Sequence, residues 1–132
     1  MEKFINSEFD LVKSGKSEYI LVVPTEPDHY EDFAVKEFKR LFYGATGIEL
    51  PVMTDENAHF DTEKSVISLG RTLIYKESGV VATYDELKRD GYKIVTKGKT
   101  VILIGGGTYG TVYAVYGFME KQFGYRYYAI DE

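Results

Sequence analysis

The feature that most constrains this 132-residue sequence is a pair of strand-like segments that runs directly into a glycine-rich turn and a helix. Residues 91–97 and 100–104 are apolar-rich and are separated by a short Lys-Gly-Lys turn, which predicts a β-hairpin. Glycines follow at 105–107, and residues 108–123 have the composition of a helix. A helix joined this closely to a strand packs on the sheet, so we expect a layered fold of helices and strands.

The rest of the chain predicts further strands. Four runs are rich in β-branched or aromatic residues, and we expect strands at 19–23, 48–53, 65–69 and 125–128. Pro51 indicates that the second of these lies at a sheet edge or ends there. Residues 71–90 predict only two short helical turns, near Leu73 and at 84–88. The opening residues through Lys16 indicate a strand or an arm that packs against the rest.

The best-marked helix is expected over residues 28–43. Asp28 and Glu31 have the spacing of a capping box, and we expect Gly44 to end the helix. Apolar residues at helical period form one stripe, consisting of Phe33, Ala34, Phe38, Leu41 and Phe42. Together these elements predict an α+β fold, an α/β sandwich with a mixed sheet and two main helices, as a single domain over residues 1–132.

Composition excludes several classes of function. With 16 basic and 21 acidic residues and no long basic run, we expect neither a nucleic-acid nor a membrane partner. The absence of cysteine excludes disulfides, thiolate zinc sites and a cysteine nucleophile. The only histidines, His29 and His59, lack a ligand partner at metal-site spacing, so we interpret both as surface residues. We therefore expect no metal and no cofactor.

One motif points to nucleotides. The run Gly105-Gly106-Gly107-Thr108-Tyr109-Gly110 matches the dinucleotide-binding pattern, and Asp131 follows about 20 residues later, as that pattern requires. That fingerprint, however, normally opens a unit with further strands downstream, and a tight strand-to-helix turn also explains the glycines. We interpret the glycines as structural residues of turns and helix ends, namely Gly105, Gly106, Gly107, Gly110 and Gly124. Nucleotide binding stays as an alternative.

No catalytic constellation is evident. An acidic cluster consists of Glu26, Asp28, Glu31 and Asp32 and could imitate the carboxylate pair of a glycosidase. Acidic residues also favour the first turn of a helix, and we interpret the cluster in that way. A nucleophile elbow (G-x-S-x-G) and a Walker lysine motif are both missing, so the sequence identifies no substrate-binding residue.

The C-terminal part has a more specific pattern. After the glycine turn come the segments Gly110-Thr111-Val112-Tyr113-Ala114-Val115-Tyr116-Gly117-Phe118-Met119-Glu120 and Gly124-Tyr125-Arg126-Tyr127-Tyr128. They resemble the end of the non-catalytic N-terminal α/β domain that precedes the barrel in β-N-acetylhexosaminidases of glycoside hydrolase family 20 and α-glucuronidases of family 67. The pattern departs from the usual one where Met119 replaces Leu and Tyr127 replaces Trp. The likeness extends, less specifically, back to Tyr19.

This resemblance implies an accessory domain of a protein that degrades polysaccharides. In those enzymes the catalytic carboxylates lie on the barrel, so no catalytic residue is transferred to this chain. The resemblance implies that the chain is a fragment preceding a catalytic barrel, that this barrel is its partner, and that the parent is secreted, periplasmic or at the cell surface. The chain itself leaves the compartment open.

Tyrosine is concentrated in the same region, since six of the 12 tyrosines lie in the last 24 residues. Tyrosine and arginine are enriched at buried interfaces. The candidate interdomain interface therefore consists of Tyr109, Arg126, Tyr127 and Tyr128, with Arg126 expected to pair with a carboxylate or with carbonyls of the barrel. In the alternative, the domain binds glycans by itself, with tyrosine rings stacked on sugars.

Overall fold

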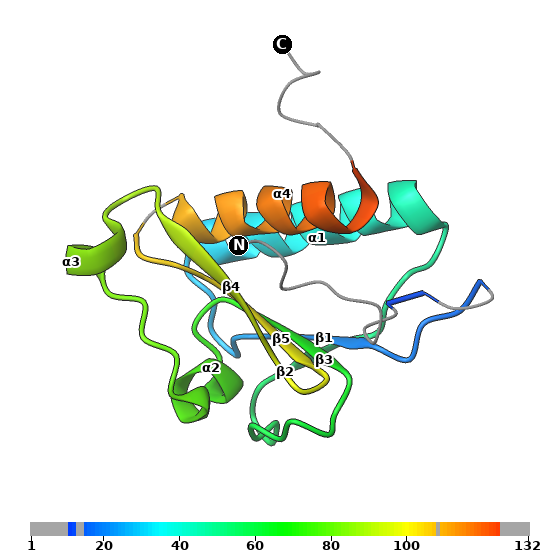
Figure 1. Cartoon of the computed structure of the whole chain (residues 1–132), viewed down its shortest axis with the longest axis horizontal. Helices are drawn as coiled ribbons and strands as arrows, with labels where there is room; N and C mark the ends of the chain where they lie inside the picture. The colour runs from blue at the N-terminus through cyan, green and yellow to red at the C-terminus, as the bar shows by residue number, and fades with distance from the viewer. Residues whose placement is uncertain (1–10, 13–14, 108, 125–132) are drawn as a thin grey trace, which may run out of the picture.

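The computed structural model describes residues 11–12, 15–107 and 109–124, which form a mixed five-stranded sheet with two long helices on one face (Figure 1). Its elements in chain order are β1 (Ile20–Val23), α1 (His29–Thr46), β2 (Val52–Thr54), β3 (Val66–Leu69), α2 (Leu73–Ser78), α3 (Tyr84–Leu87), β4 (Tyr92–Lys97), β5 (Thr100–Gly105) and α4 (Gly110–Phe123). The predicted α+β class, with its mixed sheet and two main helices, is confirmed.

The sheet has the strand order β2-β1-β3-β5-β4. Strands β2, β1, β3 and β5 are parallel, whereas β4 runs antiparallel to β5, with Val95 opposite Ile102. The predicted hairpin and the edge position of β2 are therefore confirmed. Because α1 follows β1 and α4 follows β5, both long helices begin at the edge of the sheet where the parallel strands end.

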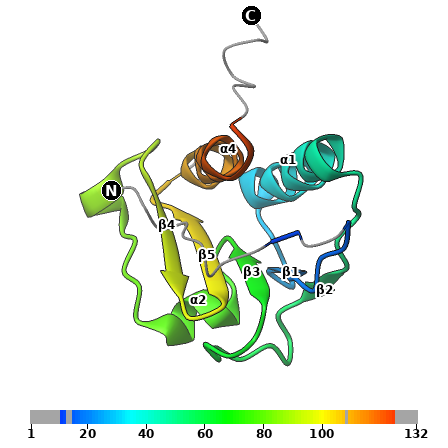
Figure 2. The same cartoon turned by 45° about the vertical axis from the view of Figure 1, so that its right-hand side comes forward.

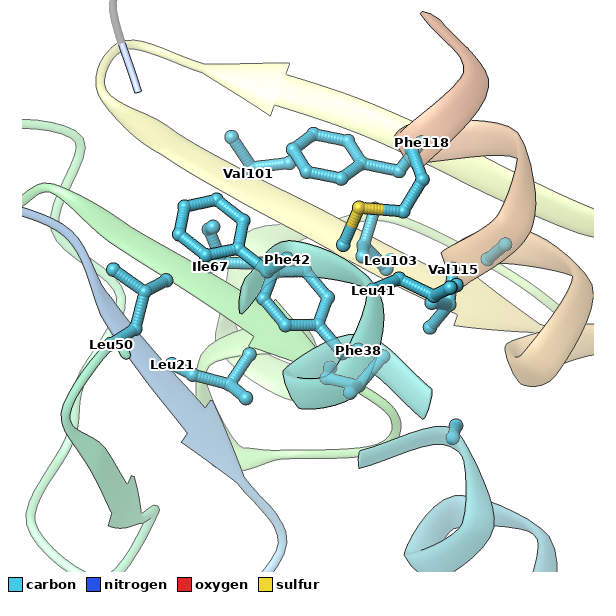
Figure 3. Close-up of a cluster of buried hydrophobic side chains, with 14 of the residues drawn as sticks. Leu21, Phe38, Leu41, Phe42, Leu50, Ile67, Val101, Leu103, Val115 and Phe118 are labelled. Carbon is cyan, nitrogen blue, oxygen red and sulfur yellow. The ribbon is translucent and has the colours of Figure 1, made fainter. Parts of the chain in front are cut away.

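The main core lies between the sheet and the two long helices, which lie side by side in both views (Figures 1 and 2). Phe38 of α1 stacks on Phe42 and on Phe118 of α4, with ring centroids 5.6 and 6.1 Å apart (Figure 3). Along β5 the side chains alternate. Val101 and Leu103 belong to this core, whereas Ile102 and Ile104 belong to a second cluster on the opposite face, together with Tyr75 of α2 and neighbouring loop residues.

Helix α1 confirms one prediction and corrects two. The capping box is present, since the Asp28 carboxylate accepts from the Glu31 N–H (2.7 Å) and the Glu31 carboxylate accepts from the Asp28 N–H (3.0 Å). Gly44 does not end the helix. The end is at Gly47, whose left-handed backbone (φ 75°) suits glycine. Phe33 was expected in the core but is 46% exposed, because it lies beside the buried stripe.

Other boundaries also differ from the expectation. Strand β2 begins at Val52 rather than at 48 and ends at Thr54, one residue past the expected run, and Leu50 packs in the core from the preceding loop. Helix α4 begins at Gly110 rather than at 108. The two short turns expected between 71 and 90 are present as α2 and α3, and Gly124 caps α4 in the left-handed conformation. The expected strand at 125–128 and the opening arm up to residue 10 lie outside the described residues. Within the described part, no helix is long and apolar enough to cross a membrane.

Candidate functional site

A cleft of about 440 Å³ lies at the edge where the parallel strands end. It is formed by the start of α1, the turn after β3 and the turn after β5. Its lining residues are Asp28, His29, Tyr30, Glu31, Arg71, Gly105, Gly106, Gly107 and Thr111. In open α/β sheets, ligands commonly bind in the crevice outside the carboxyl ends of the strands, so this cleft is the first candidate site.

Glu31 is the buried carboxylate of this cleft, with 9% of its surface exposed. One oxygen accepts the capping bond from Asp28, and the other accepts the backbone N–H of Arg71 at 2.9 Å. Gly70 makes room for this contact, since a Cβ there would lie 2.8 Å from the Glu31 carboxylate. Glu31 therefore joins α1 to the turn after β3. The other members of the acidic cluster, Glu26 and Asp32, are exposed, and Asp32 pairs with Lys36 at 3.2 Å.

Arg71 joins the same turn to the glycine turn. Its guanidinium donates to the carbonyls of Gly105 (2.9 Å) and Ala82 (3.1 Å) and to the Tyr75 hydroxyl (3.3 Å). The guanidinium carbon also lies 5.5 Å from the centre of the Tyr75 ring. Sequence reasoning gave Arg71 no role. The available signal was its place directly after Gly70, the glycine that follows β3.

The glycine turn is packed against backbone on both sides. A Cβ on Gly105 would lie 2.2 Å from the carbonyl carbon of Gly110, and one on Gly110 would lie 2.4 Å from the carbonyl oxygen of Gly91. A Cβ on Gly106 or on Gly107 would also come within 3.0 Å of a neighbouring atom. These glycines therefore permit a close approach between β5, α4 and the segment before β4.

Two amides of this turn have protein partners. The Gly105 N–H donates to the Thr111 hydroxyl (3.1 Å), and the Gly106 N–H donates to the Gly91 carbonyl (3.0 Å). A phosphate cradle needs such N–H groups to point at the ligand. The carboxylates of Asp28 and Glu31 line the same cleft and would repel a phosphate. The geometry thus disfavours the nucleotide alternative.

The Asp55 carboxylate connects the loops after β1 and β2 to α2 at the same edge by hydrogen bonds. One carboxylate oxygen accepts from the Thr25 N–H (2.9 Å) and hydroxyl (2.6 Å), and the other accepts from the Leu73 N–H (2.8 Å). Burial raises the pKa of Asp55, but the hydrogen bonds from Thr25 and Leu73 outweigh it and hold the pKa below its usual value. The loops after β1 and β2 and the start of α2 are thereby held together.

The two histidines lie apart on the surface. His59 contacts the Glu77 carboxylate at 3.1 Å, and both side chains are exposed. The pKa of Glu77 is lowered by the hydrogen bond from the Phe60 N–H and then by His59. His29 is exposed and meets the Tyr30 ring edge-on at 5.3 Å. Within the described ranges, no three His, Cys, Asp or Glu side chains are grouped to hold a metal ion.

A second candidate is aromatic and lies on the outer side of α4. Its rings follow one another, with centroids 5.1 Å apart for Tyr30 and Tyr109, 6.3 Å for Tyr109 and Tyr113, and 6.4 Å for Tyr113 and Tyr116. Tyr92 of β4 packs against the flank of α4 at Gly117, where an added Cβ would come 2.6 Å from the Tyr92 hydroxyl. We call these residues, Tyr30, Tyr92, Tyr109, Tyr113 and Tyr116, the tyrosine surface.

The tyrosine surface is open to solvent at its centre. Tyr109, Tyr113 and Tyr92 are 42, 40 and 39% exposed. A hollow of about 280 Å³ is lined by Tyr92, Tyr113, Tyr116, Gly117 and Glu120. Of the candidate interface residues, Tyr109 belongs to this surface, while Arg126, Tyr127 and Tyr128 lie outside the described residues. Sequence reasoning missed Tyr30 and Tyr92, because their place beside α4 depends on tertiary packing.

Comparison with known proteins identifies relatives over most of the chain. Residues 9–118 match the family model described as "Glycosyl hydrolase family 67 N-terminus". An alpha-glucuronidase from Hypocrea jecorina is 28% identical over 87 residues, which are 66% of this chain and 10% of that protein. The match thus spans about a tenth of the length of this curated relative. The likeness to family 20 stays a prediction.

Proposed function

The chain belongs to the family of N-terminal domains of family 67 glycosyl hydrolases, and from this premise we propose that it is a non-catalytic accessory domain of a glycoside hydrolase. Two observations from the comparisons support the proposal. The family is described as an N-terminus, and the matched region of the alpha-glucuronidase is 10% of that protein. Nine-tenths of the relative is thus left to hold a catalytic centre.

The observation that carries the proposal is that both oxygens of the buried Glu31 carboxylate accept backbone hydrogen bonds. Most glycosidases need two carboxyl groups that face each other across the scissile bond. Here Asp28 and Glu31 are bonded to each other's backbone in the capping box, and the second oxygen of Glu31 holds the Arg71 amide. Both groups serve the connection between α1 and the sheet, and neither is placed opposite the other across an open site.

We further propose that the partner of this domain is the catalytic barrel of its own polypeptide, and that the parent enzyme acts in polysaccharide degradation as an α-glucuronidase. The substrate class rests on the name of the relative. A β-N-acetylhexosaminidase-type parent is the alternative that the sequence resemblance leaves.

Two measurements test this function. In cells that make the protein, an antibody against this domain should detect a polypeptide several times larger than 15.0 kDa. A product of about 15 kDa would contradict the proposal. The purified 132-residue chain should release no nitrophenol from nitrophenyl α-glucuronide or nitrophenyl N-acetyl-β-glucosaminide. Hydrolysis that Glu31→Gln abolishes, while the variant stays folded, would show an active site in this chain.

A second candidate function is an independent glycan-binding module. The hollow on the tyrosine surface favours it, since three tyrosines and Glu120 line that hollow. Aromatic faces and carboxylate acceptors suit the apolar faces and the hydroxyl groups of sugars. The experiment of the next subsection separates this candidate from a protein interface.

A further inference from the structure

We propose that the tyrosine surface is the face by which this domain docks on the catalytic domain of its own polypeptide. This inference rests on the proposed function and adds the surface, its residues and its orientation. The helix layer of α1 and α4, which covers one face of the sheet (Figure 1), then lies between the sheet and the catalytic domain.

The chemistry of the surface is that of a protein interface. Tyrosine is among the residues most enriched at binding hot spots, because it offers a large, stiff ring with a polar tip. Phe33 of α1 extends the apolar area, since it is 46% exposed. On the helix it lies between Tyr30 and Glu37, both of which contact residues of the tyrosine surface from α1. An exposed aromatic area that crosses two helices marks a contact site.

The surface is held in place before any partner binds. The Tyr116 hydroxyl donates to the Glu37 carboxylate at 2.9 Å, and Arg40 holds the same carboxylate at 2.9 and 3.1 Å. On the other flank, the Arg89 guanidinium carbon lies 5.9 Å from the centre of the Tyr109 ring. Rings fixed in this way lose little freedom on binding, which favours a stable contact.

The point at which the chain leaves this domain also supports the catalytic domain as the partner. The family is described as an N-terminus, so the rest of such an enzyme follows this domain. The chain leaves α4 at Gly124, eleven residues after Tyr113, which corresponds to about 16 Å along the helix axis. A catalytic domain tethered there is attached to the helix that presents the tyrosines, and it has a high effective concentration at their surface.

The ring geometry favours a protein over a glycan. A sugar chain stacks best on rings that lie in one plane, but Tyr109 and Tyr113 are inclined by 36° and Tyr113 and Tyr116 by 44°. The hollow beside them is lined in part by Gly117, over which the Tyr92 ring packs. An irregular surface of this kind is complementary to inserted side chains.

The test compares the long polypeptide with the 132-residue chain by hydroxyl-radical footprinting and mass spectrometry. In the long polypeptide we expect oxidation of Tyr109 and Tyr113 to fall about fivefold or more, because docked hot-spot rings are removed from water. Tyr43 on α1 and Tyr84 on α3, each 57% exposed and outside the tyrosine surface, serve as internal controls. Equal labelling of Tyr113 in both forms would overturn the docking surface while leaving the accessory function in place. The absence of any long polypeptide would overturn both.

Variants give a second readout in the long polypeptide. Tyr113→Lys should speed proteolytic release of this domain about fivefold or more, whereas Tyr43→Lys should not. Tyr109→Ser repeats the test with a smaller change should the charged variant fold poorly. Release at the parental rate in both surface variants would contradict the proposal. In the 132-residue chain, millimolar xylo-, cello- or chito-oligosaccharide should leave the labelling of Tyr92 and Tyr113 unchanged. If one of these oligosaccharides specifically protects Tyr92 and Tyr113 from oxidation, the surface binds a glycan and the proposed protein partner is wrong.

Discussion

The carboxylate of Glu31 accepts a hydrogen bond from the backbone N–H of Arg71, forty residues later in the chain, at 2.9 Å. The guanidinium of Arg71 in turn holds the Gly105 carbonyl at 2.9 Å. These two hydrogen bonds connect the turn after β1 to the turn after β3, and the turn after β3 to the turn after β5. The connected turns lie at the edge of the sheet where ligands of other α/β proteins bind. In this domain the polar groups at that edge connect loops, which agrees with a structural role.

Removing this link should destabilise the fold. Glu31→Ala leaves the Arg71 N–H and the Asp28 N–H without their acceptor, and we expect the free energy of unfolding to fall by about 2–3 kcal/mol. Glu31→Gln keeps an amide oxygen and should lose about 1 kcal/mol. Urea unfolding followed by circular dichroism measures both. The control is Asp32→Ala, which removes an exposed ion pair and should change stability by about 0.5 kcal/mol or less. Equal losses at both positions would contradict the assigned role.

Gly105→Ala should be one of the most damaging single changes in the chain. The added Cβ would lie 2.2 Å from the backbone of both Gly110 and Thr111, and neither atom can move without shifting α4 from the sheet. We expect a loss of about 3 kcal/mol or more, measured by thermal or urea unfolding. A Gly105→Ala protein with parental stability would show that the close approach of β5 and α4 is wrong.

The end of α1 can be tested with two neighbouring glycines. Gly44 is exposed inside the helix with no atom near its Cβ position, so Gly44→Ala should raise stability by about 0.5–1 kcal/mol. Gly47 has a left-handed backbone, so Gly47→Ala should lower it by about 1 kcal/mol. Thermal unfolding of both variants measures these signs. The reverse pair of signs would place the helix end at Gly44.

Patterns that depend on neighbouring residues were predictable. The capping box spans three residues, and the hairpin joins strands that follow one another, so both were visible in the sequence. The end of α1 was not, because Gly44 and Gly47 are both plausible helix ends in the sequence, and the helix continues through Gly44 to Thr46. The Thr46 hydroxyl bonds back to the Phe42 carbonyl at 2.8 Å. Phe33 has the right spacing for the stripe but lies at its rim.

The candidate site was less predictable, because its contacts join distant parts of the chain. Tyr116 and Glu37 are 79 residues apart in sequence, and the bond between them sets one side of the tyrosine surface. The place of Arg71 after β3 and Gly70 marks the end of a strand, but it does not show that the guanidinium bonds to the Gly105 carbonyl, 34 residues later. The motif at 105–110 is the reverse case, since the sequence matches a phosphate-binding pattern while Thr111 and Gly91 accept the bonds of two of its amides.

Nucleotides should therefore fail to stabilise the protein. A ligand that binds only the folded state raises its stability, by about 1.4 kcal/mol at ten times the dissociation constant. We expect millimolar ATP or NAD to leave the melting temperature of the 132-residue chain unchanged, because two amides of the turn are occupied and two carboxylates line the cleft. A saturable rise in the melting temperature that Gly107→Asp removes would restore the nucleotide-binding interpretation.

Acid should weaken the fold partly through Asp55. Its pKa is lowered in the folded protein, because the hydrogen bonds from Thr25 and Leu73 to the carboxylate outweigh the effect of burial. A lowered folded pKa means that the ionised group stabilises the fold above the unfolded pKa, about 3.9, and that this contribution is lost as the pH falls through the folded value. We expect Asp55→Asn to lower the free energy of unfolding by about 1–2 kcal/mol at pH 7.

The difference between parent and Asp55→Asn should shrink as the pH falls below about 4, because the protonated parent then resembles the amide. Urea unfolding at pH values from 7 to 2.5 measures this difference. The pKa of Glu37 is also lowered, mainly by its hydrogen bond with Arg40. Glu37 is present in both proteins, so subtracting the two stability curves removes its contribution. Thr25→Val, which removes only the hydroxyl donor at 2.6 Å, should show a smaller loss and a weaker dependence on pH. A difference that stays constant across this range would mean that the Asp55 carboxylate is not held by its charge.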